Sequence, residues 1–530
     1  SLVFTLPITG LILWWVFGSV LTALVPLFLA IVGLVASLGA AAIISRLIEP
    51  ISATAHQLVV LLVLAVGVDY ALFFISRVRD ECKGGKDYLE AIRRARETTG
   101  RAIVWSGVTV ALSLVGLFFV RDTVLESMAI VSIVAIIIVV ILTMYALPFI
   151  LKSMGRERVL PRRGGDGDSG ASSMAIVSRC ALQRPRLALL LSVVPLIALA
   201  SYAFSVRFGS VMERHLLPAR MQTAQAFETL RRSFPQLSGT SFTLIMRGIG
   251  VEELEEAGEL QFALERIKML PGVSGPISTE FSSDNTILRY TFLVEGTAND
   301  YINRAHIETI RKEIIPAELQ SRGLSGWVSG SLAYVSDETA RYLARTPLVI
   351  GGVLCVSAVL LLFVFRSALI PLKAVALNLL SCGAAFGAVA LTFQTSLLPG
   401  WNLGVVEGFV PALLFAILFG LSMDYHVLLI ARTREGVLEG LDTAAAVERA
   451  VHATGRSITG AAAIMASVFL VVSTLELPVM RQLGVGLAVG VVIDATIIRA
   501  VLVPAAMVLL GRWNWYLPRW AVVREASRKE

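Results

Sequence analysis

The dipeptide Asp-Tyr occurs twice inside long apolar stretches, at Asp69-Tyr70 and at Asp424-Tyr425, 355 residues apart. The chain repeats itself around these pairs: from Asp69 to Ile103, 14 of 35 positions are identical to those 355 residues later, without a gap. A carboxylate is costly in hydrocarbon, and burial favours its neutral form, so each Asp could take up a proton near neutral pH and release it when solvent access changes. The repeated pairs therefore predict a proton relay, with a static polar contact between two helices as the alternative.

The spacing within each pair predicts how the two copies meet. Adjacent residues on a helix point about 100° apart, so an Asp and its neighbouring Tyr do not readily bond to each other along one face. Two such helices side by side can pair crosswise, with Tyr425 donating to Asp69 and Tyr70 donating to Asp424. Protonation of the carboxylates would weaken these bonds and let the two halves shift.

Three more polar residues lie in the apolar stretches. His426 follows the second pair; it could extend the relay or tune Asp424, and the preferred interpretation is a surface-facing histidine near the end of its span. Asp494 completes the set of three carboxylates well inside the predicted spans and lies five residues before Arg499. We interpret these two as a buried structural ion pair, with a secondary role in the relay as the alternative.

The composition places these residues in a membrane protein. Of 530 residues, 56% are hydrophobic and 16% are charged, against about 25% charged in an average soluble domain, which excludes a cytosolic enzyme or a DNA-binding factor. The four cysteines have no metal-ligand spacing, and neither a metal site nor a disulfide framework is expected. Charge-free residues 1–45 predict two helices, broken near Phe17, Gly18, Ser19 and Pro26. Nine further spans bring the expected total to eleven: 57–76, 102–120, 127–151, 187–206, 346–365, 374–394, 405–431, 457–475 and 483–511.

The basic residues predict the orientation. Loops and tail on one face carry 25 Lys and Arg and the short loops on the other carry three, so the first face is expected to be cytoplasmic. Residues 207–344 then lie outside, with a net charge of −3. Helical patterns there alternate with β-rich runs, which predicts a small α+β domain of βαβ character. The predicted helices are 219–234, 250–270 and 299–319, and the predicted strands are 240–247 and 286–295.

The internal repeat predicts the domain organisation. Two copies of equal orientation imply parallel repeats about an axis along the membrane normal, as in secondary transporters. The second half begins with a span and an outside domain, so we expect a matching span and domain, of about 150 to 200 residues, ahead of residue 1, and twelve spans in the complete protein. The predicted units are 1–151 (helices two to six), 152–186 (cytoplasmic linker), 187–206 (helix seven), 207–344 (outside domain), 345–511 (helices eight to twelve) and 512–530 (basic tail).

Four segments carry a family resemblance: GVDYALFFISRVRDE, FGLSMDYHVLLIARTREG, VIDATIIRAVLVPA and LGRWNWYLPRW. Together they resemble the MmpL family of the RND (resistance-nodulation-division) superfamily, over essentially the whole chain. The resemblance implies a bacterial inner-membrane exporter driven by the proton gradient, with a periplasmic porter domain. It also makes Phe73, four residues after Asp69, and its counterpart Leu428 plausible gates of a central cavity, although ordinary core packing explains them as well.

The expected function is proton-coupled export of lipids, glycolipids or amphipathic metabolites by a secondary transporter that is not an enzyme. The alternatives are a lipid- or sterol-sensing receptor of the same fold without net transport, a drug efflux pump, and a helper of protein secretion. No Walker A sequence occurs, so ATP is not indicated, and no cofactor is expected besides protons as the coupling ion. Expected partners are amphipathic cargo, membrane lipids, accessory periplasmic proteins or further copies of the chain, and no nucleic acid.

Overall fold

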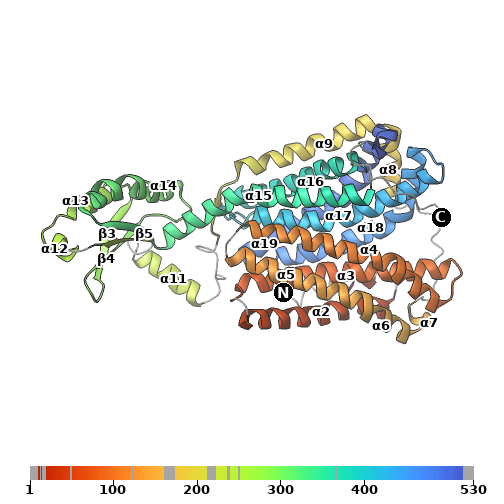
Figure 1. Cartoon of the computed structure of the whole chain (residues 1–530), viewed down its shortest axis with the longest axis horizontal. Coiled ribbons are helices and arrows are strands. Elements are labelled where there is room, and N and C mark those ends of the chain that lie inside the picture. Colours follow the sequence, from red (N-terminus) through yellow and green to blue (C-terminus); the bar gives the residue numbers. More distant parts are fainter. Residues whose placement is uncertain are drawn as a thin grey trace, which may run out of the picture.

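A bundle of long helices makes up most of the molecule, and an α+β domain lies at one end of it (Figure 1). The computed structural model describes residues 7, 10, 11, 13, 14, 19–47, 50–120, 123–159, 173–211, 222–234, 239–248, 251–365 and 367–516. The first half of the bundle contains α2 (Val20–Leu47), α3 (Ala53–Lys83), α4 (Tyr88–Val115) with η1 (Gly116–Phe119), α5 (Thr123–Ile141), the π-helical η2 (Leu142–Ala146), and α6 (Leu147–Met154). The second half contains α9 (Pro185–Ser201) with η3 (Tyr202–Ser205), α15 (Ser331–Phe365), α16 (Leu369–Gln394), α17 (Val410–Leu438), α18 (Thr443–Ser473), α19 (Pro478–Ile493), the π-helical η7 (Asp494–Leu502), α20 (Val503–Leu510) and η8 (Gly511–Trp515). Two short helices, α7 (Arg156–Val159) and α8 (Ser173–Gln183), lie between the halves in sequence.

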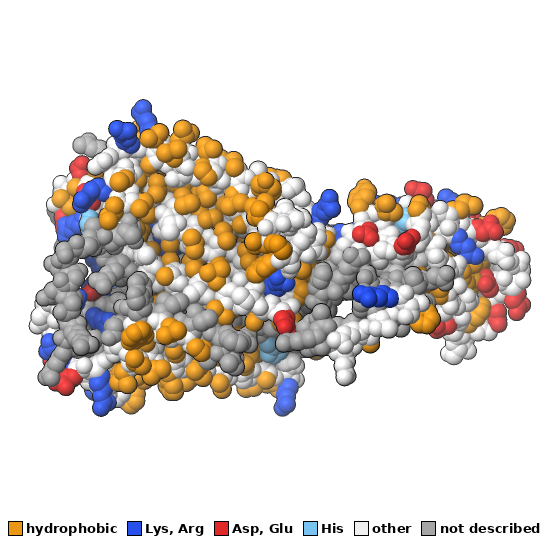
Figure 2. Space-filling view, turned by 180° about the vertical axis from the view of Figure 1, so that it is seen from behind, with side chains coloured by type: hydrophobic (Ala, Val, Ile, Leu, Met, Phe, Trp, Pro, Cys, Tyr) orange, Lys and Arg blue, Asp and Glu red, His pale blue; other side chains and the backbone are white. Residues whose placement is uncertain are grey.

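Within the described ranges, nine helices are long and apolar enough to cross a membrane, and α18 would be a tenth span, bent by 50° after Gly455. Most of the predicted first span lies outside the described residues. Helix α2 begins at Val20, next to the break expected near Ser19, and it continues through Pro26, so the break does not extend to this proline. Apolar side chains cover the broad surface of the bundle, while Lys and Arg gather at the end away from the α+β domain (Figure 2). Such a surface is solvated by lipid, and the chain is a multi-pass membrane protein.

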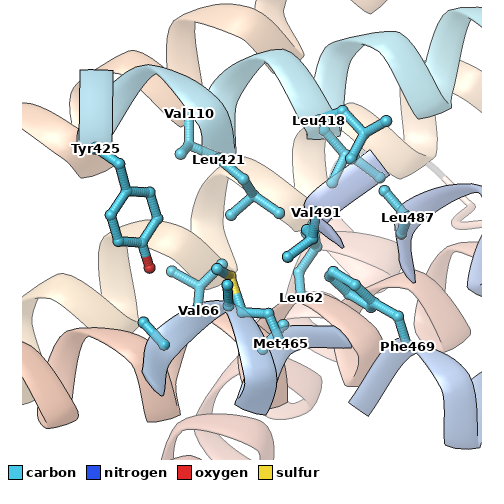
Figure 3. Packing of buried hydrophobic residues seen from close by; sticks show 14 of the residues in the cluster. Leu62, Val66, Val110, Leu418, Leu421, Tyr425, Met465, Phe469, Leu487 and Val491 are labelled. Atoms are coloured by element: carbon cyan, nitrogen blue, oxygen red, sulfur yellow. The ribbon is translucent and has the colours of Figure 1, made fainter. Parts of the chain in front are cut away.

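The two helices with Asp-Tyr pairs lie at the centre of the bundle. About nine-tenths of the apolar segment is buried in both α3 (89%) and α17 (88%), against 6% in the peripheral α9. Each central helix packs against the other half, α3 on α18 and α17 on α4. Figure 3 shows the apolar cluster in which these helices meet α19. The labelled residues are Leu62 and Val66 of α3, Val110 of α4, Leu418, Leu421 and Tyr425 of α17, Met465 and Phe469 of α18, and Leu487 and Val491 of α19.

The α+β domain is built on a four-stranded antiparallel sheet of order β3-β4-β2-β5. Its elements are α11 (Gln222–Ser233), β2 (Thr240–Arg247), α12 (Val251–Glu256), α13 (Gln261–Lys268), β3 (Val273–Phe281), β4 (Ile287–Val294), α14 (Tyr301–Thr309), η5 (Ile310–Leu319), η6 (Gln320–Arg322) and β5 (Ser325–Ser329). Alternate residues of β2, among them Phe242 and Leu244, are buried against the helices, as a half-covered strand requires. The strands β2 and β4 lie where they were predicted. The single helix predicted over 250–270 is wrong, because Gly258 adopts a positive φ of 73° between α12 and α13.

The domain and the bundle are joined by α15 and by a short parallel strand pair. The predicted boundary between residues 344 and 345 falls inside α15, which continues from one part into the other (Figure 1). Strand β1 (Phe208–Gly209) pairs with β6 (Val406–Glu407), which precedes α17. The Glu407 carboxylate accepts a hydrogen bond from the Val211 N–H at 2.9 Å, and its own N–H donates to Gln482 Oε1 on α19 at 3.1 Å. Glu407 thereby connects the strand that enters the domain with two helices of the bundle.

Candidate functional site

A hydrogen bond between the two halves lies at the centre of the bundle. The Tyr425 hydroxyl of α17 is 2.6 Å from Asp69 Oδ1 and 2.7 Å from Asp69 Oδ2 of α3. Both side chains are buried, with 1% and 3% of their surface exposed. This contact has the crosswise geometry that the sequence predicts for one of its two Asp-Tyr pairings.

The second predicted pairing, between Tyr70 and Asp424, is not described, because the Asp424 side chain lies outside the described part of the chain. The Tyr70 hydroxyl is 2.6 Å from Ser106 Oγ on α4. Tyr70 is 2% exposed, so its hydroxyl depends on protein partners.

The Asp494–Arg499 ion pair is buried, as expected, and it also reaches the central hydrogen bond. An Arg499 amino group donates to Asp494, within the π-helical η7. The wider turn of a π-helix suits this five-residue spacing, which an α-helix would place slightly off one face. The guanidinium carbon lies 4.2 Å from the centre of the Tyr425 ring, and Nη2 donates to the Ser422 carbonyl at 3.1 Å. Arg499 therefore contacts the residue that bonds to Asp69, a contact that the sequence did not indicate.

The interpretation of His426 as surface-facing is wrong. This residue is 1% exposed, because α17 lies at the centre of the bundle and is covered on nearly all sides. Within the described part of the chain, neither ring nitrogen has a hydrogen-bond partner.

A cavity of about 410 Å³ adjoins the hydrogen bond between Asp69 and Tyr425. It is lined by residues of α3, α4 and α17: Asp69, Tyr70, Phe73, Arg77, Thr98, Thr99, Ala102, Ile103, Ser106, Tyr425, Leu428, Ala431, Arg432 and Glu435. The lining extends along α3 from Asp69 to Arg77, which corresponds to about 12 Å of helix. One end of the cavity is therefore the buried carboxylate, and the other is lined by the charged side chains of Arg77, Arg432 and Glu435.

Phe73 and Leu428 both line this cavity, Phe73 from α3 and Leu428 from α17. The Phe73 ring lies 5.3 Å from the Tyr425 ring, tilted by 44°, which is a favourable aromatic contact. The structure thus brings together the two residues singled out as possible gates and places them beside the central hydrogen bond. Their gating role remains a prediction.

Several polar residues near the centre were missed from the sequence. Ser106 of α4 contacts Tyr70, and the Ser422 hydroxyl of α17 donates to Asn378 Oδ1 of α16 at 2.9 Å. Serines are common in membrane helices, where they often bond to the preceding turn of their own helix. The sequence therefore does not distinguish Ser106 and Ser422 from other serines in the spans. Asn378 is the more informative omission, because an amide inside an apolar span needs a polar partner.

The fold and the site place the chain in a known class. The sequence profile of the MMPL family matches residues 2–184 and 215–529, and the chain belongs to this family of the RND superfamily. The chain is 30% identical to the mycolic acid-containing lipids exporter MmpL11 of Mycolicibacterium smegmatis, over 97% of this chain and 55% of that protein. It is 28% identical to the trehalose monomycolate exporter MmpL3 of Mycobacterium tuberculosis, over 98% of this chain and 58% of that protein.

The chain thus spans little more than half the length of these relatives. Among solved structures, it is similar to SecDF, a translocon-associated membrane protein from Thermus thermophilus, with a TM-score of 0.58. The alignment covers 96% of this chain and 61% of SecDF at 15% identity, which supports a common fold. The names of the two relatives describe lipid exporters.

Proposed function

We propose that this chain belongs to a secondary transporter that exports lipids, glycolipids or amphipathic metabolites in exchange for protons. The observation that carries the proposal is the hydrogen bond from Tyr425 to Asp69, which joins the two halves at the inner end of the 410 Å³ cavity. Asp69 is a carboxyl group that a proton can reach through this cavity, and its bonding partner belongs to the other half of the bundle.

Protonation of Asp69 would change the contact between the halves. An ionised carboxylate is the stronger acceptor for the Tyr425 hydroxyl, and it also attracts the Arg499 guanidinium that lies over the Tyr425 ring. A neutral carboxyl group weakens both attractions, so α3 and α17 become free to move relative to each other. One proton crossing a potential of 100 mV yields about 2.3 kcal/mol, which is enough to bias such a movement.

We further propose that the protein lies in the bacterial plasma membrane with the α+β domain outside. The unequal numbers of Lys and Arg on the two ends of the bundle support this orientation. The cavity beside Asp69 then begins at the cytoplasmic end, next to Arg77 and Arg432. The lipid exporters among the relatives support amphipathic cargo for this chain as well.

The test is reconstitution of the full-length protein in liposomes loaded with a fluorescent lipid or dye, with an imposed pH gradient. Asp69→Asn keeps the size of the side chain and removes the titrating group, and we expect it to abolish gradient-driven efflux. Glu97→Gln makes the same chemical change at an exposed site on α4 and should leave efflux unchanged. Efflux in Asp69→Asn at the wild-type rate would refute the relay, and cargo movement that ignores the pH gradient would refute proton coupling.

A further inference from the structure

A second, smaller cavity lies beside Arg499, whose guanidinium contacts the Tyr425 ring. It is enclosed by α16, α17, α18, α19 and η7 and shares no lining residue with the cavity beside Asp69. Part of its wall is apolar and is visible in Figure 3, where Leu418, Leu421, Met465 and Val491 converge. The centre of a water-sized sphere can move within about 10 Å³ of it, which is the room that one water molecule needs.

Three buried polar atoms belong to side chains that line this cavity and have no hydrogen-bond partner within the described part of the chain. They are Asn378 Nδ2, Asp494 Oδ1 and Arg499 Nε. Asn378 is 1% exposed, Arg499 is 2% exposed and Asp494 is 5% exposed. Leaving such groups unbonded is unfavourable, and more so when they are charged.

The chemistry of the three atoms identifies the ligand. A cation would face the positive Arg499 and the amide donor of Asn378, whose oxygen accepts from the Ser422 hydroxyl. An anion would face the carboxylate of Asp494. Water both accepts and donates, and a buried water typically makes about three hydrogen bonds. We propose that this cavity binds one water molecule, which accepts from Asn378 Nδ2 and Arg499 Nε and donates to Asp494 Oδ1.

This water connects α16 with the central hydrogen bond. Through it, Asn378 holds Arg499 on one side, and the guanidinium contacts the Tyr425 ring on the other. Asn378 also accepts from Ser422, whose carbonyl accepts from Arg499, so amide, hydroxyl, guanidinium and water form a closed polar ring. Asn378 is thereby a positioning residue for Arg499. Its effect on transport rests on the proposed function, whereas the binding of water does not.

The first measurement is a structure of the full-length wild-type protein in lipid nanodiscs at a resolution that resolves ordered water. We expect one density peak within hydrogen-bond distance of Asn378 Nδ2, Asp494 Oδ1 and Arg499 Nε. An empty cavity at that resolution would overturn the proposal. So would a peak that changes when Na⁺ is replaced by Rb⁺ or Cl⁻ by Br⁻, because the ligand would then be an ion.

The second measurement compares Asn378→Leu, of similar size without the amide, with Met465→Leu, which alters the same cavity without changing its polar groups. We expect Asn378→Leu to lose the density, to slow gradient-driven efflux about tenfold and to shift its pH profile, because Arg499 loses a bonding partner. Met465→Leu should keep the wild-type pH profile. Wild-type efflux and pH profile in Asn378→Leu would overturn the positioning role.

The density in the wild-type protein tests whether water is bound, even if Asn378→Leu does not fold. Asn378→Ser, whose hydroxyl can still bond to water, then replaces it in the transport assay and should shift the pH profile in the same direction by a smaller amount. If the wild-type protein shows no gradient-driven efflux, the proposed function fails, and the density alone still accepts or rejects the water.

Discussion

The last span of each half of the bundle contains a π-helical segment just before a proline. Segment η2 precedes Pro148 in the first half, and η7 precedes Pro504 in the second. Proline lacks an N–H and crowds the turn before it, so a widened turn is the same local response in both places. What differs is the chemistry, because η7 carries Asp494 and Arg499 whereas Val139 and Met144 stand 355 residues earlier. Both halves therefore share a π-helical segment before a proline, but only the segment of the second half contains a buried charge pair.

This difference gives the two halves unequal roles around Asp69. The first half contributes the carboxylate on α3 and, through α3 and α4, most of the lining of the cavity that reaches it. The second half contributes Tyr425 as the hydrogen-bond donor and Arg499 as the cation behind its ring. A change in the charge of Asp69 is thus felt mainly by α17 and η7, and equivalent substitutions in the two halves should have very different effects.

The largest contrast is expected between Arg499→Met and its counterpart Met144→Leu. Removing the guanidinium leaves Asp494 as an unpaired buried charge, which costs about 3–5 kcal/mol in the free energy of unfolding. Met144→Leu conserves volume in an apolar place and should cost less than about 1.5 kcal/mol. Thermal unfolding of the two purified variants in the same detergent measures the difference. Equal destabilisation would mean that the charge pair contributes nothing beyond packing.

Next in size is the contrast between Tyr425→Phe and Tyr70→Phe. Tyr425→Phe removes a hydrogen bond to a carboxylate, worth about 2–3 kcal/mol, and should slow gradient-driven efflux about 30-fold or more. Tyr70→Phe removes the contact with the Ser106 hydroxyl, and we expect a smaller loss. Initial efflux rates in liposomes compare the two variants. Losses of the same size would show that both tyrosines contribute equally to the relay, and that the two halves differ only in the charge pair that contains Arg499.

The sequence predicts this asymmetric site only in part. Charge-free runs place the spans, and the 355-residue repeat predicts the bond between Tyr425 and Asp69, because both signals depend on the local order of residues. The contact of Arg499 with Tyr425 depends on how η7 packs against α17, which no local pattern specifies. His426 was misplaced for the same reason: its position near the end of a span suggested exposure, while the packing of α17 at the centre buries it. The strands β3 and β5 were missed because they alternate weakly and contain Gly, Pro and Ser.

The smallest expected contrast is between substitutions of Glu407 and of Ser52. Glu407 precedes α17 at the end of the bundle that faces the α+β domain. Ser52 is its counterpart 355 residues earlier and precedes α3. Burial raises the pKa of Glu407 from its usual 4.5 to about 7, with a further rise from Glu338 on α15 and an opposing effect of the Val211 N–H. The folded protein therefore keeps this proton at pH values where the unfolded chain has lost it. The resulting stabilisation is complete below about pH 4.5 and is lost as the pH rises through about 7.

Glu407→Gln mimics the neutral carboxyl group and should flatten this part of the pH dependence, whereas Ser52→Ala should leave it intact. The unfolding temperature measured in detergent between about pH 5 and pH 8 checks both variants. The wild type and Ser52→Ala should lose stability towards the alkaline end, and Glu407→Gln should lose less. If Glu407→Gln follows the wild-type curve, Glu407 is already ionised in the folded protein, and the junction of β1 with β6 depends on its strand pairing and on Gln482 instead.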